Sequence, residues 1–415
     1  VNRLQKLHPK EIDLSLDRIK LLCEKLGNPQ DKIKAISVVG TNGKQSTINA
    51  IFSILKEAKM RCNVYSSPHV QRINERFIFN NQELKDEKLA FLFEEVEKIN
   101  DNQPITFFEI LTACYFYEAA QYPENINLIE AGLFHRFDAT NILKKNLASV
   151  VTSISKDHLD WLPKNEQTIE KIVYEKTSSL LKSNIIVSKQ NLVSTKETIK
   201  KTILNNSSNK LFFNENFSYS NVENGFFYYE DKFGSLKLPL PNILGQFQLE
   251  NISTAIATLR LLNIDIKDDD IKNGITKIES VARLQEIKSG RLKKLVKNNQ
   301  LLLDGSHNED GARVLNEYLQ TLDCNKHVVL GMMANKAHEK YISYFKDISS
   351  LITIDIPGQP NSISGKDLKE KFKSMPNVQY KESIEQAIKS IPLKGNDLVI
   401  ITGSLYLAGE ILNLN

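Results

Sequence analysis

Short hydrophobic runs alternate with helical patterns along most of the chain. The run AISVVG at residues 35–40 predicts a buried strand that ends in a glycine turn. In residues 46–59, apolar side chains recur at helical spacing, at Ile51, Ile54, Leu55 and Ala58. Strands followed by helices in this way are typical of a parallel α/β architecture.

The same alternation continues toward the C-terminus. Residues 109–120 are apolar almost all round, which predicts a buried helix. The segment 211–240 differs, because aromatic and polar residues alternate around turn residues there and predict antiparallel hairpins. Further apolar runs predict strands at 126–132, 149–154, 301–304, 327–332, 351–356 and 397–402.

The predicted strand at 35–40 and the helix after it are joined by the sequence GTNGKQST at 40–47. Glycines in such a turn let backbone N–H groups approach phosphate oxygens, and Lys44 adds a positive charge at the helix N-terminus. The strict GxxxxGK[ST] pattern is not met, because Val38 occupies the place of its first glycine and Gln45 follows the lysine. A plain strand-to-helix turn is the alternative, but the flanking strand and helix favour nucleotide binding.

The length of 415 residues suits two or three domains of ~100–200 residues. Residues 286–299 are basic and rich in turn-forming residues, so we place a domain junction there. We expect an α/β protein with a P-loop-type, mostly parallel sheet and a small antiparallel portion in residues 1–285. A smaller, Rossmann-like α/β domain would then occupy residues 286–415.

Composition narrows the class of function. Lys and Arg number 54 against 50 Asp and Glu, and no basic stripe indicates nucleic-acid binding. The four cysteines form no CxxC pair, which favours a reducing compartment over a disulfide framework or a cysteine-based zinc site. No run of 18 apolar residues occurs, and the polar residues around Lys6, Lys10 and Glu11 do not resemble an export signal. We therefore expect a cytoplasmic, soluble monomer that contacts neither nucleic acid nor a membrane.

Beyond the loop at 40–47, a series of short motifs follows along the chain. They are IDLSLDR at 12–18, YSSPH at 65–69, NER at 74–76, ITFFE at 105–109, EAGL at 130–133, RFDATN at 136–141, DHLDWL at 157–162, EK at 175–176, DGSHN at 304–308 and GSLY at 403–406. In this order the chain resembles the dihydrofolate/folylpolyglutamate synthases of the Mur ligase superfamily, whose loop usually reads GTNGKGS. The resemblance runs almost end to end.

This resemblance implies an ATP-dependent ligase that joins L-glutamate to dihydropteroate, to a reduced folate, or to both. A carboxylate attacks the γ-phosphorus of ATP and becomes an acyl phosphate, and the amine of glutamate then displaces phosphate. Such chemistry depends mainly on positioning and on neutralising charge. Two alternatives stay open at this point: a Mur ligase acting on a UDP-muramyl substrate, and a relative that binds ATP without catalysis.

The resemblance also implies roles for single residues. Mg²⁺ would be bound by Ser67, Glu130 and His158, and both Lys44 and His158 would act in catalysis. Lys176 corresponds to a family lysine that is typically carbamylated, which requires a lowered lysine pKa. With its base between the domains, ATP would contact Thr41, Asn42, Gly43, Lys44, Gln45, Ser46, Thr47, Asn251, Arg283, Asp304 and His307.

For the pterin-bearing substrate, the resemblance implicates Thr106, Phe107, Phe108 and Asp138. Aromatic rings stack on flat heterocycles, and a carboxylate can pair with the amino and ring N–H groups of a pterin. Two phenylalanines before an apolar helix are also common in core packing, so core packing is the alternative for these two rings.

The chain departs from the family pattern at several positions. Phe134 and His135 replace the two glycines of the usual LGGR, and TSS at 177–179 replaces the AGI of EKAGI. Adjacent glycines imply close backbone approach or positive φ, so either the loop takes another path here or its bulk serves selectivity. Ala282 replaces the glycine of the usual PGR, and Phe247 replaces a common histidine.

Overall fold

The computed structural model describes residues 15–206, 209–373, 375 and 377–415, which divide into two compact units. Unit 1 is the described part of Val1–Asn242 together with Gln248–Ile278. Unit 2 is Ile243–Phe247 together with the described part of Glu279–Asn415. The segment around Lys6, Lys10 and Glu11, and the first residues of the motif at 12–18, lie outside the described residues.

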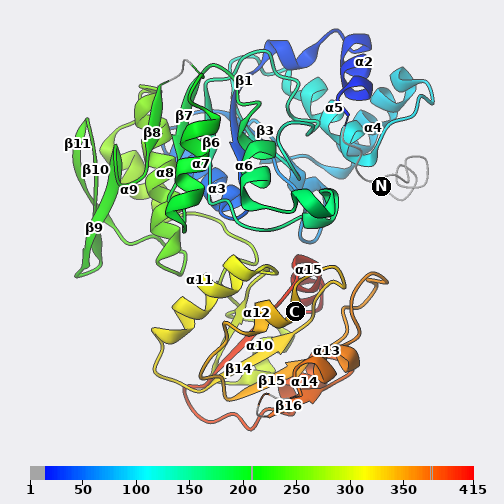
Figure 1. Ribbon diagram of the computed structural model, residues 1–415, viewed down its shortest axis with the longest axis vertical. Helices are drawn as coiled ribbons and strands as arrows, with labels where there is room; N and C mark the ends of the chain where they lie inside the picture. Colours follow the sequence, from blue (N-terminus) through cyan, green and yellow to red (C-terminus); the bar gives the residue numbers. More distant parts are fainter. Residues whose placement is uncertain (1–14, 207–208, 374, 376) are drawn as a thin grey trace. The chain divides into compact units, whose positions relative to one another are not determined.

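Unit 1 is built on an eight-stranded sheet with the order β4-β3-β2-β5-β1-β6-β7-β8 (Figure 1). Neighbouring strands from β2 to β8 run parallel, whereas β3 and β4 add an antiparallel edge. The strands are β1 (Lys34–Val39), β2 (Cys62–Tyr65), β3 (Phe77–Phe79), β4 (Gln82–Glu83), β5 (Ile126–Glu130), β6 (Ala148–Val151), β7 (Asn184–Val187) and β8 (Lys210–Phe212).

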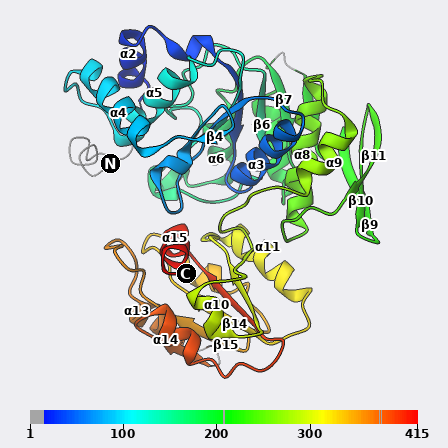
Figure 2. The same cartoon turned by 180° about the vertical axis from the view of Figure 1, so that it is seen from behind.

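Helices cover both faces of this sheet. The helices α6 and α7 lie in front of it in Figure 1, and α3 lies in front in the reverse view of Figure 2. The helices of this part of the chain are α2 (Asp17–Lys25), α3 (Lys44–Glu57), α4 (Asp86–Asn100), α5 (Phe107–Ala119), α6 (Ile169–Thr177), α7 (Val193–Thr202), α8 (Phe247–Leu261) and α9 (Asp268–Ile275). Short 3₁₀ turns are η1 (Pro29–Lys32), η2 (Ile73–Arg76), η3 (Leu159–Trp161) and η4 (Lys164–Glu166).

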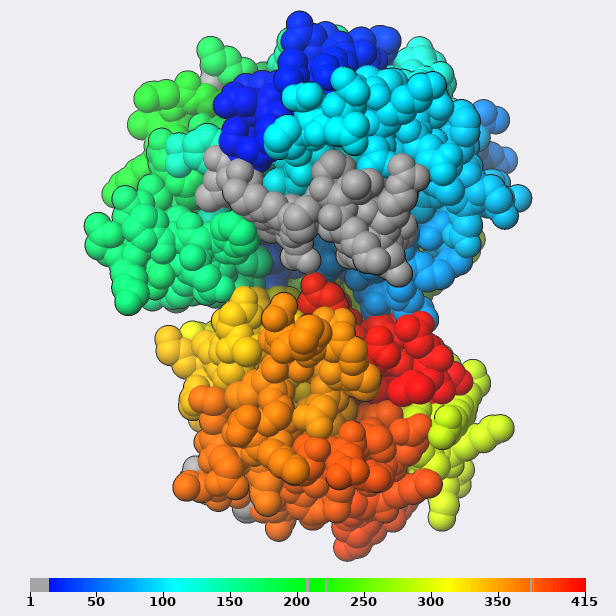
Figure 3. Space-filling model, turned by 90° about the vertical axis from the view of Figure 1, so that its right-hand side faces the viewer, coloured from blue at the N-terminus to red at the C-terminus, as the bar shows by residue number. Residues whose placement is uncertain are grey.

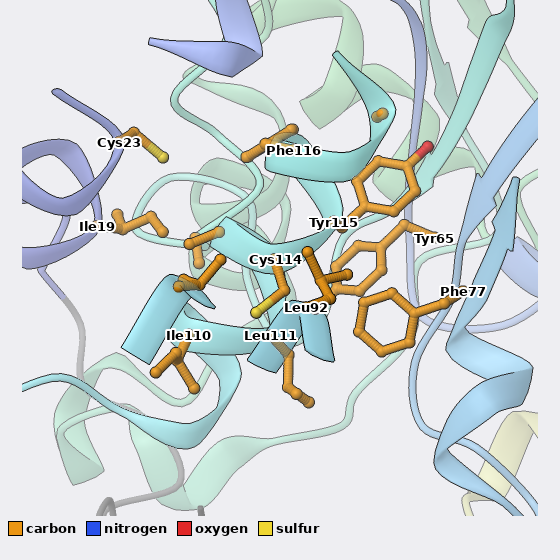
Figure 4. Close-up of a cluster of buried hydrophobic side chains, with 14 of the residues drawn as sticks. Ile19, Cys23, Tyr65, Phe77, Leu92, Ile110, Leu111, Cys114, Tyr115 and Phe116 are labelled. Atoms are coloured by element: carbon orange, nitrogen blue, oxygen red, sulfur yellow. The ribbon is translucent and has the colours of Figure 1, made fainter. Parts of the chain in front are cut away.

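The helix α5 forms the centre of one hydrophobic core, as its all-round apolar sequence predicts. Thr106 caps its N-terminus. The Thr106 hydroxyl accepts a hydrogen bond from the Glu109 backbone N–H at 3.2 Å, and the Glu109 carboxylate accepts from the Thr106 N–H at 2.8 Å. In Figure 4 the rings of Tyr65, Phe77 and Tyr115 lie together in this core. The Tyr65 and Tyr115 ring centroids are 4.8 Å apart, so strand β2 is packed directly onto α5.

The segment 211–240, predicted to form antiparallel hairpins, does so only in part. Strands β9 (Phe217–Glu223), β10 (Phe226–Asp231) and β11 (Gly234–Pro239) form a separate antiparallel sheet, which confirms that part of the prediction. The first strand of the segment, β8, instead extends the main sheet in parallel beside β7. The hairpin interpretation was wrong for β8, because a short aromatic strand has the same local pattern at a parallel edge.

Unit 2 carries a six-stranded sheet with the order β12-β13-β17-β14-β15-β16, parallel except at β12. On the face drawn in Figure 3, much of its surface is formed by the orange segment from α12 to α14. Its strands are β12 (Gln285–Glu286), β13 (Gln300–Leu303), β14 (Lys326–Leu330), β15 (Ser350–Thr353), β16 (Val378–Tyr380) and β17 (Leu398–Thr402). Its helices are α10 (Arg291–Val296), α11 (Glu309–Gln320), α12 (His338–Ile342), α13 (Gly365–Lys371), α14 (Ile384–Lys389) and α15 (Leu405–Leu414).

The two units divide between Ile278 and Glu279, earlier than the junction expected within residues 286–299. The physical reason is that β12 pairs antiparallel with β13, so the residues just before the expected junction belong to the second sheet. The expected fold class is confirmed: a mostly parallel sheet with an antiparallel portion, followed by a smaller α/β unit. Among the described residues, no helix combines the length and the apolar character needed to cross a membrane.

Candidate active site

The loop at 40–47 leaves β1 and enters α3, as predicted, and its shape depends on two glycines. Gly40 has a φ of 152° and Gly43, the residue that caps α3, has a φ of 86°. A Cβ on Gly40 would lie 1.9 Å from Thr152 Oγ1, because the end of β6 backs the loop. Glycine is therefore needed at both positions, since the backbone conformation at each disfavours a side chain.

The segment after β6 holds this loop in place. The backbone N–H groups of Thr41 and Asn42 donate to the carbonyl oxygen of Ser153, at 2.8 and 3.2 Å. The Thr41 hydroxyl donates to Ser155 O and accepts from Ser155 N, both at 3.1 Å. At the other end of the loop, the Thr47 hydroxyl donates to Gly43 O at 2.8 Å within the first turn of α3. These hydrogen bonds hold the loop at both of its ends.

Two lysines meet at the loop. Lys44 Nζ donates to the carbonyl oxygens of Gly40 and Thr41, each at 3.3 Å. Lys176, near the end of α6, donates to Gly40 O at 2.9 Å and to Leu133 O at 2.8 Å. Lys176 is buried, and its burial and the nearby charge of Lys44 lower its pKa to about 7. Much of this amine is therefore neutral at physiological pH.

A buried carboxylate completes this group. Glu130 is the last residue of β5 and is paired in register with Val38 of β1, so it lies beside the start of the loop. One of its oxygens accepts from the Ser67 backbone N–H at 3.0 Å, and the other lies 3.9 Å from Lys44 Nζ. The structure thus brings together Lys44, Ser67 and Glu130 at the carboxyl edge of the parallel strands, where α/β sheets bind ligands.

The remaining expected metal ligand, His158, lies at the start of η3 in a left-handed conformation with a φ of 57°. Its backbone N–H donates to Asp157 Oδ1 at 2.9 Å, and its Nε2 lies 3.8 Å from Asp157 Oδ2. No three His, Cys, Asp or Glu side chains cluster as a metal site within the described residues. The oxygens of Glu130 and Ser67 still suit Mg²⁺, which retains several waters and needs only one or two carboxylates.

Asn251, predicted to contact ATP, lies against the loop from α8. A Cβ on Gly43 would come within 2.5 Å of Asn251 Oδ1. The Asn251 amide nitrogen donates to Gln248 Oε1 at 3.0 Å, and Asn251 itself is buried. The amide is therefore held in one orientation, with its oxygen toward the glycine that caps α3.

The other three residues expected to bind ATP form a separate group within unit 2. Asp304 follows β13, and its carboxylate accepts from the backbone N–H groups of Leu284 and Ser306, both at 2.9 Å. His307 Nδ1 lies 2.9 Å from Gly305 O. A Cβ on Gly305 would lie 3.0 Å from Arg283 Nη1, so these residues surround one turn.

Of the residues expected to bind the pterin, two meet at Gly132. A Cβ there would lie 3.0 Å from Asp138 Oδ2 and 3.1 Å from Phe108 Cζ. The Phe108 ring also stacks on Tyr65, with centroids 6.1 Å apart. Phe107 packs instead in the core around α5, and Thr106 caps that helix. Phe107 is therefore a core residue, as the alternative predicts. Phe108 packs against the core as well, but it also borders Gly132 and Asp138.

The Asp138 carboxylate is occupied by its own loop. Oδ2 accepts from the backbone N–H groups of Gly132 and Leu133 at 2.9 and 3.3 Å. Oδ1 accepts from the backbone N–H and the hydroxyl of Thr140 at 3.0 and 2.6 Å. Burial raises the pKa of Asp138, while these hydrogen bonds favour the carboxylate. In the structure this side chain shapes the turn after β5.

Sequence reasoning missed the part played by the segment after β6 and by the Leu133 carbonyl. Polar residues directly after a buried strand, here Thr152 and Ser153, were the available signal for the first. Nothing in the sequence marks a backbone carbonyl such as that of Leu133. The substituted glycine positions are now explained as well: neither Phe134 nor His135 has a positive φ, so the backbone at both positions accepts a side chain.

The sequence is similar to a known family of ligases. A family model described as Mur ligase, glutamate ligase domain, matches residues 290–405. The chain is 31% identical to the dihydrofolate synthase/folylpolyglutamate synthase of Haemophilus influenzae, covering 98% of this chain and 94% of that protein. It is 29% identical to the Bacillus subtilis protein of the same name, covering 95% and 94%.

Solved structures of folylpolyglutamate and dihydrofolate synthases also match the chain over almost its whole length. The structure of Escherichia coli FolC in complex with DHPP and ADP matches with a TM-score of 0.88 and 28% identity, over 99% of this chain and 95% of that one. The bifunctional folylpolyglutamate synthase/dihydrofolate synthase from Yersinia pestis, complexed with AMPPNP and a Mn ion, matches with a TM-score of 0.86 and 26% identity, over 99% and 96%. Both units of the chain are included in these matches.

Proposed function

We propose, because this chain belongs to the dihydrofolate synthase/folylpolyglutamate synthase family, that it is an ATP-dependent ligase. It joins L-glutamate to dihydropteroate or to a reduced folate through an amide bond. The observation that carries this proposal is the convergence of Lys44, Lys176 and Glu130 around the loop at 40–47. The full-length similarity to folate ligases favours this function over a UDP-muramyl ligase, and the retained charged residues favour catalysis over binding alone.

The chemistry requires that two anions, the triphosphate of ATP and the substrate carboxylate, be held close together. In this proposal the backbone N–H groups at the start of α3 and the Lys44 ammonium bind the phosphates. The substrate carboxylate attacks the γ-phosphorus, ADP leaves, and the acyl phosphate that forms is attacked by the amine of glutamate. Loss of phosphate and a proton completes the amide. The other proposed ATP contacts are Thr41, Asn42, Gln45, Ser46, Thr47, Asn251, Arg283, Asp304 and His307.

Mg²⁺ is the metal that we propose for this site, with Glu130, Ser67 and His158 as its protein ligands. The Glu130 carboxylate supports this, because it is buried at the strand edge beside Lys44 and offers hard oxygen donors. When bound, the ion would neutralise phosphate charge. The similar Yersinia pestis structure holds AMPPNP and a Mn ion.

We also propose that Lys176 is carbamylated. A neutral lysine amine attacks CO₂, and loss of one proton leaves an anionic carbamate. The burial of Lys176 and the charge of Lys44 favour the neutral amine, which supports this reaction at neutral pH. The carbamate would place a negative charge beside Lys44.

For the folate substrate, we propose that the Phe108 ring contacts the pterin, because it borders Gly132 and is only partly buried where it packs against the core around α5. Asp138 acts by shaping the turn after β5, since its four hydrogen bonds hold that turn. Thr106 and Phe107 act indirectly, by fixing the start of α5.

A substrate panel tests the function. ATP and glutamate are supplied with dihydropteroate, tetrahydrofolate or a UDP-muramyl peptide, and phosphate release and product masses are measured. We expect activity with the first two and glutamate-sized mass additions, which would also separate first addition from tail extension. Lys44→Ala should abolish turnover. Release with the muramyl peptide alone, or with none of the three, would overturn the proposal.

A further inference from the structure

The loop at residues 133–136, where the chain departs from its family, is joined along its length to the end of α6. The Arg136 backbone N–H donates to Glu175 O at 2.9 Å. The Arg136 guanidinium pairs with both Glu175 carboxylate oxygens, each at 2.7 Å. At the start of the loop, Leu133 O accepts from Lys176 Nζ at 2.8 Å. The end of α6 thus carries Lys176 and also contacts the loop at 133–136. That loop supplies Leu133 O, one of the two carbonyl oxygens to which Lys176 donates.

Two further side chains, His135 and Asn141, bind the residue just beyond α6. His135 Nδ1 lies 2.9 Å from Ser179 Oγ, just beyond α6. The Asn141 amide donates to the same oxygen at 3.0 Å and to Arg136 O at 3.3 Å. His135 is buried, and its burial and the charge of Lys176 lower its pKa to about 4. The imidazole is therefore neutral, which suits a hydroxyl that accepts from Asn141 and donates to Nδ1.

Phe134 covers Lys176 from another side. Its ring centroid lies 5.5 Å from Lys176 Nζ, and the side chain is only 2% exposed. The charged groups that act on Lys176 are Lys44 on α3, Asp157 after β6, and Asp138 in the turn after β5. Phe134 excludes water from the lysine, and His135 remains neutral beside it, so neither adds a charge to this set.

The contact between His135 and Ser179 replaces a different pair in the family pattern. LGGR and EKAGI place glycine and isoleucine at the positions that His135 and Ser179 occupy here. In this chain both positions carry polar side chains, and the two are joined by a hydrogen bond. His135 is buried and Ser179 is half-buried, and a buried polar group left without a hydrogen-bond partner is costly.

We infer that His135 and Ser179 are positioning residues for Lys176: their hydrogen bond fixes the loop at 133–136 to α6, so that the Leu133 carbonyl holds the lysine amine beside Gly40. The inference depends on the proposed function only in that Lys176 acts in the reaction. It concerns the unmodified amine of Lys176, the form that reacts with CO₂ and the form that acetylation labels. Without the pair, the loop is still joined to α6 through Arg136 and Glu175, but the Leu133 carbonyl is held less tightly against Lys176. Neither residue needs to touch a substrate.

Ser179→Ala is the decisive variant, because it removes one hydroxyl and should leave the fold intact. We expect its kcat to fall roughly tenfold, while KM for ATP stays within about twofold, since misplacement of a catalytic group affects turnover first. His135→Ala should behave in the same way, and His135→Asn, which keeps a polar group near the Nδ1 position, should retain most of the rate. Ser178→Ala, at the exposed neighbouring serine, is the matched control and should be unchanged.

Two further measurements separate positioning from general destabilisation. In a Lys176→Ala background, Ser179→Ala should cause no additional loss of the residual rate. In the absence of substrates, competitive acetylation of Lys176 across a pH series, read by mass spectrometry, should give an apparent pKa that differs between Ser179→Ala and the parent. The inference is overturned if Ser179→Ala matches Ser178→Ala in kcat and in Lys176 labelling, or if its effect persists without Lys176. If the parent protein lacks ligase activity, the proposed function fails. The inference is then decided by whether the apparent pKa of Lys176 differs between the parent and Ser179→Ala.

Discussion

At the scale of single residues, the site is organised by one backbone oxygen that two lysines share. Gly40 O accepts from Lys44 Nζ at 3.3 Å and from Lys176 Nζ at 2.9 Å. Two ammonium groups on one acceptor repel each other, and burial adds a desolvation penalty to the inner one. The neutral form of Lys176 relieves both costs. Burial and, after it, the charge of Lys44 therefore lower the pKa of Lys176 to about 7.

Replacement of Lys176 by alanine tests whether a carbamate is needed. We expect a loss of turnover of roughly 10²–10³-fold, comparable to the loss of an activated catalytic group. Acetate or another short carboxylic acid should restore part of the rate, because it supplies an anion in the vacated space. Rates of phosphate release with and without added acid are the measurement. The exposed lysine at Lys182 is the control, since its replacement should change neither the rate nor the response to acid.

The folded protein should lose stability through His135 as the solution becomes acidic. Its pKa lies near 4 in the folded chain, below the ordinary value of 6.5, because the side chain is buried near Lys176. Between these values only the unfolded chain binds the proton, so the free energy of unfolding falls as pH decreases from about 6.5 to about 4. The full effect is at most about 3 kcal/mol.

The measurement is a set of denaturant titrations across that pH range for the parent protein and His135→Asn. Other titrating groups contribute equally to both proteins, so the difference between the two curves isolates His135. The parent should lose stability relative to the variant only within this window. Parallel curves would contradict the assignment of a buried, neutral imidazole.

The sequence allowed some of these residue-scale features to be predicted and not others. Lys44, Glu130 and Lys176 follow from their motifs, and the structure places the first two 3.9 Å apart. The four hydrogen bonds to Asp138 come mostly from backbone N–H groups, which no residue pattern displays. Ser179 is 44 positions from His135, so the polar pair that explains both departures became visible only in three dimensions.

At the scale of elements, the loop at 40–47 is held by the segment after β6 on one side and by α8 on the other. Thr152 lies against Gly40, and Asn251 lies against Gly43. Both neighbours leave no room for a Cβ, and both glycines have positive φ. The predicted strand, turn and helix therefore hold their shape through elements that follow more than 100 and 200 residues later in the chain.

Gly43→Ala should be more damaging than positive φ alone explains. Gly225, in the turn between β9 and β10, has a similar φ of 79° but nothing within 4 Å of an added Cβ. We expect Gly225→Ala to cost about 1 kcal/mol from backbone strain, and Gly43→Ala about 3 kcal/mol because the Asn251 clash is added. Thermal unfolding of both variants measures this, and nucleotide affinity should fall only for Gly43→Ala. Equal losses of stability would mean that Asn251 moves aside without cost.

Element types were predictable wherever a strong hydrophobic period was present. The apolar residues of α3 and α5 recur as helical packing requires, and both helices form where expected. The error at β8 has a physical origin, since the alternation of aromatic and polar residues reports one buried face and not the direction of the neighbouring strand. The direction of β8 is determined by α7, which returns the chain to the same sheet edge.

At the scale of the whole molecule, the residues proposed to bind ATP divide between two units. The loop at 40–47 and Asn251 belong to unit 1, whereas Arg283, Asp304 and His307 belong to unit 2. In each unit part of the group follows the carboxyl end of a parallel strand: the loop at 40–47 follows β1, and Asp304 and His307 follow β13. Parallel sheets bind ligands at that edge, so each unit places its group where the fold favours it.

Arg283→Ala tests whether this arginine of unit 2 contributes to nucleotide binding. Positive φ values at Ala282 and Leu284 flank this arginine, and Asp304 fixes the following backbone N–H, so its position is set by the turn. A hydrogen bond from arginine to a phosphate contributes about 1.5–3 kcal/mol, which predicts roughly a ten- to hundredfold rise in the Kd of a non-hydrolysable ATP analogue. Calorimetric titration of the full chain is the measurement. Arg291→Ala, at an exposed arginine of the same unit, should bind normally. An affinity for Arg283→Ala within twofold of the parent would remove Arg283 from the proposed ATP contacts, and Asp304 and His307 would then be the contacts left to unit 2.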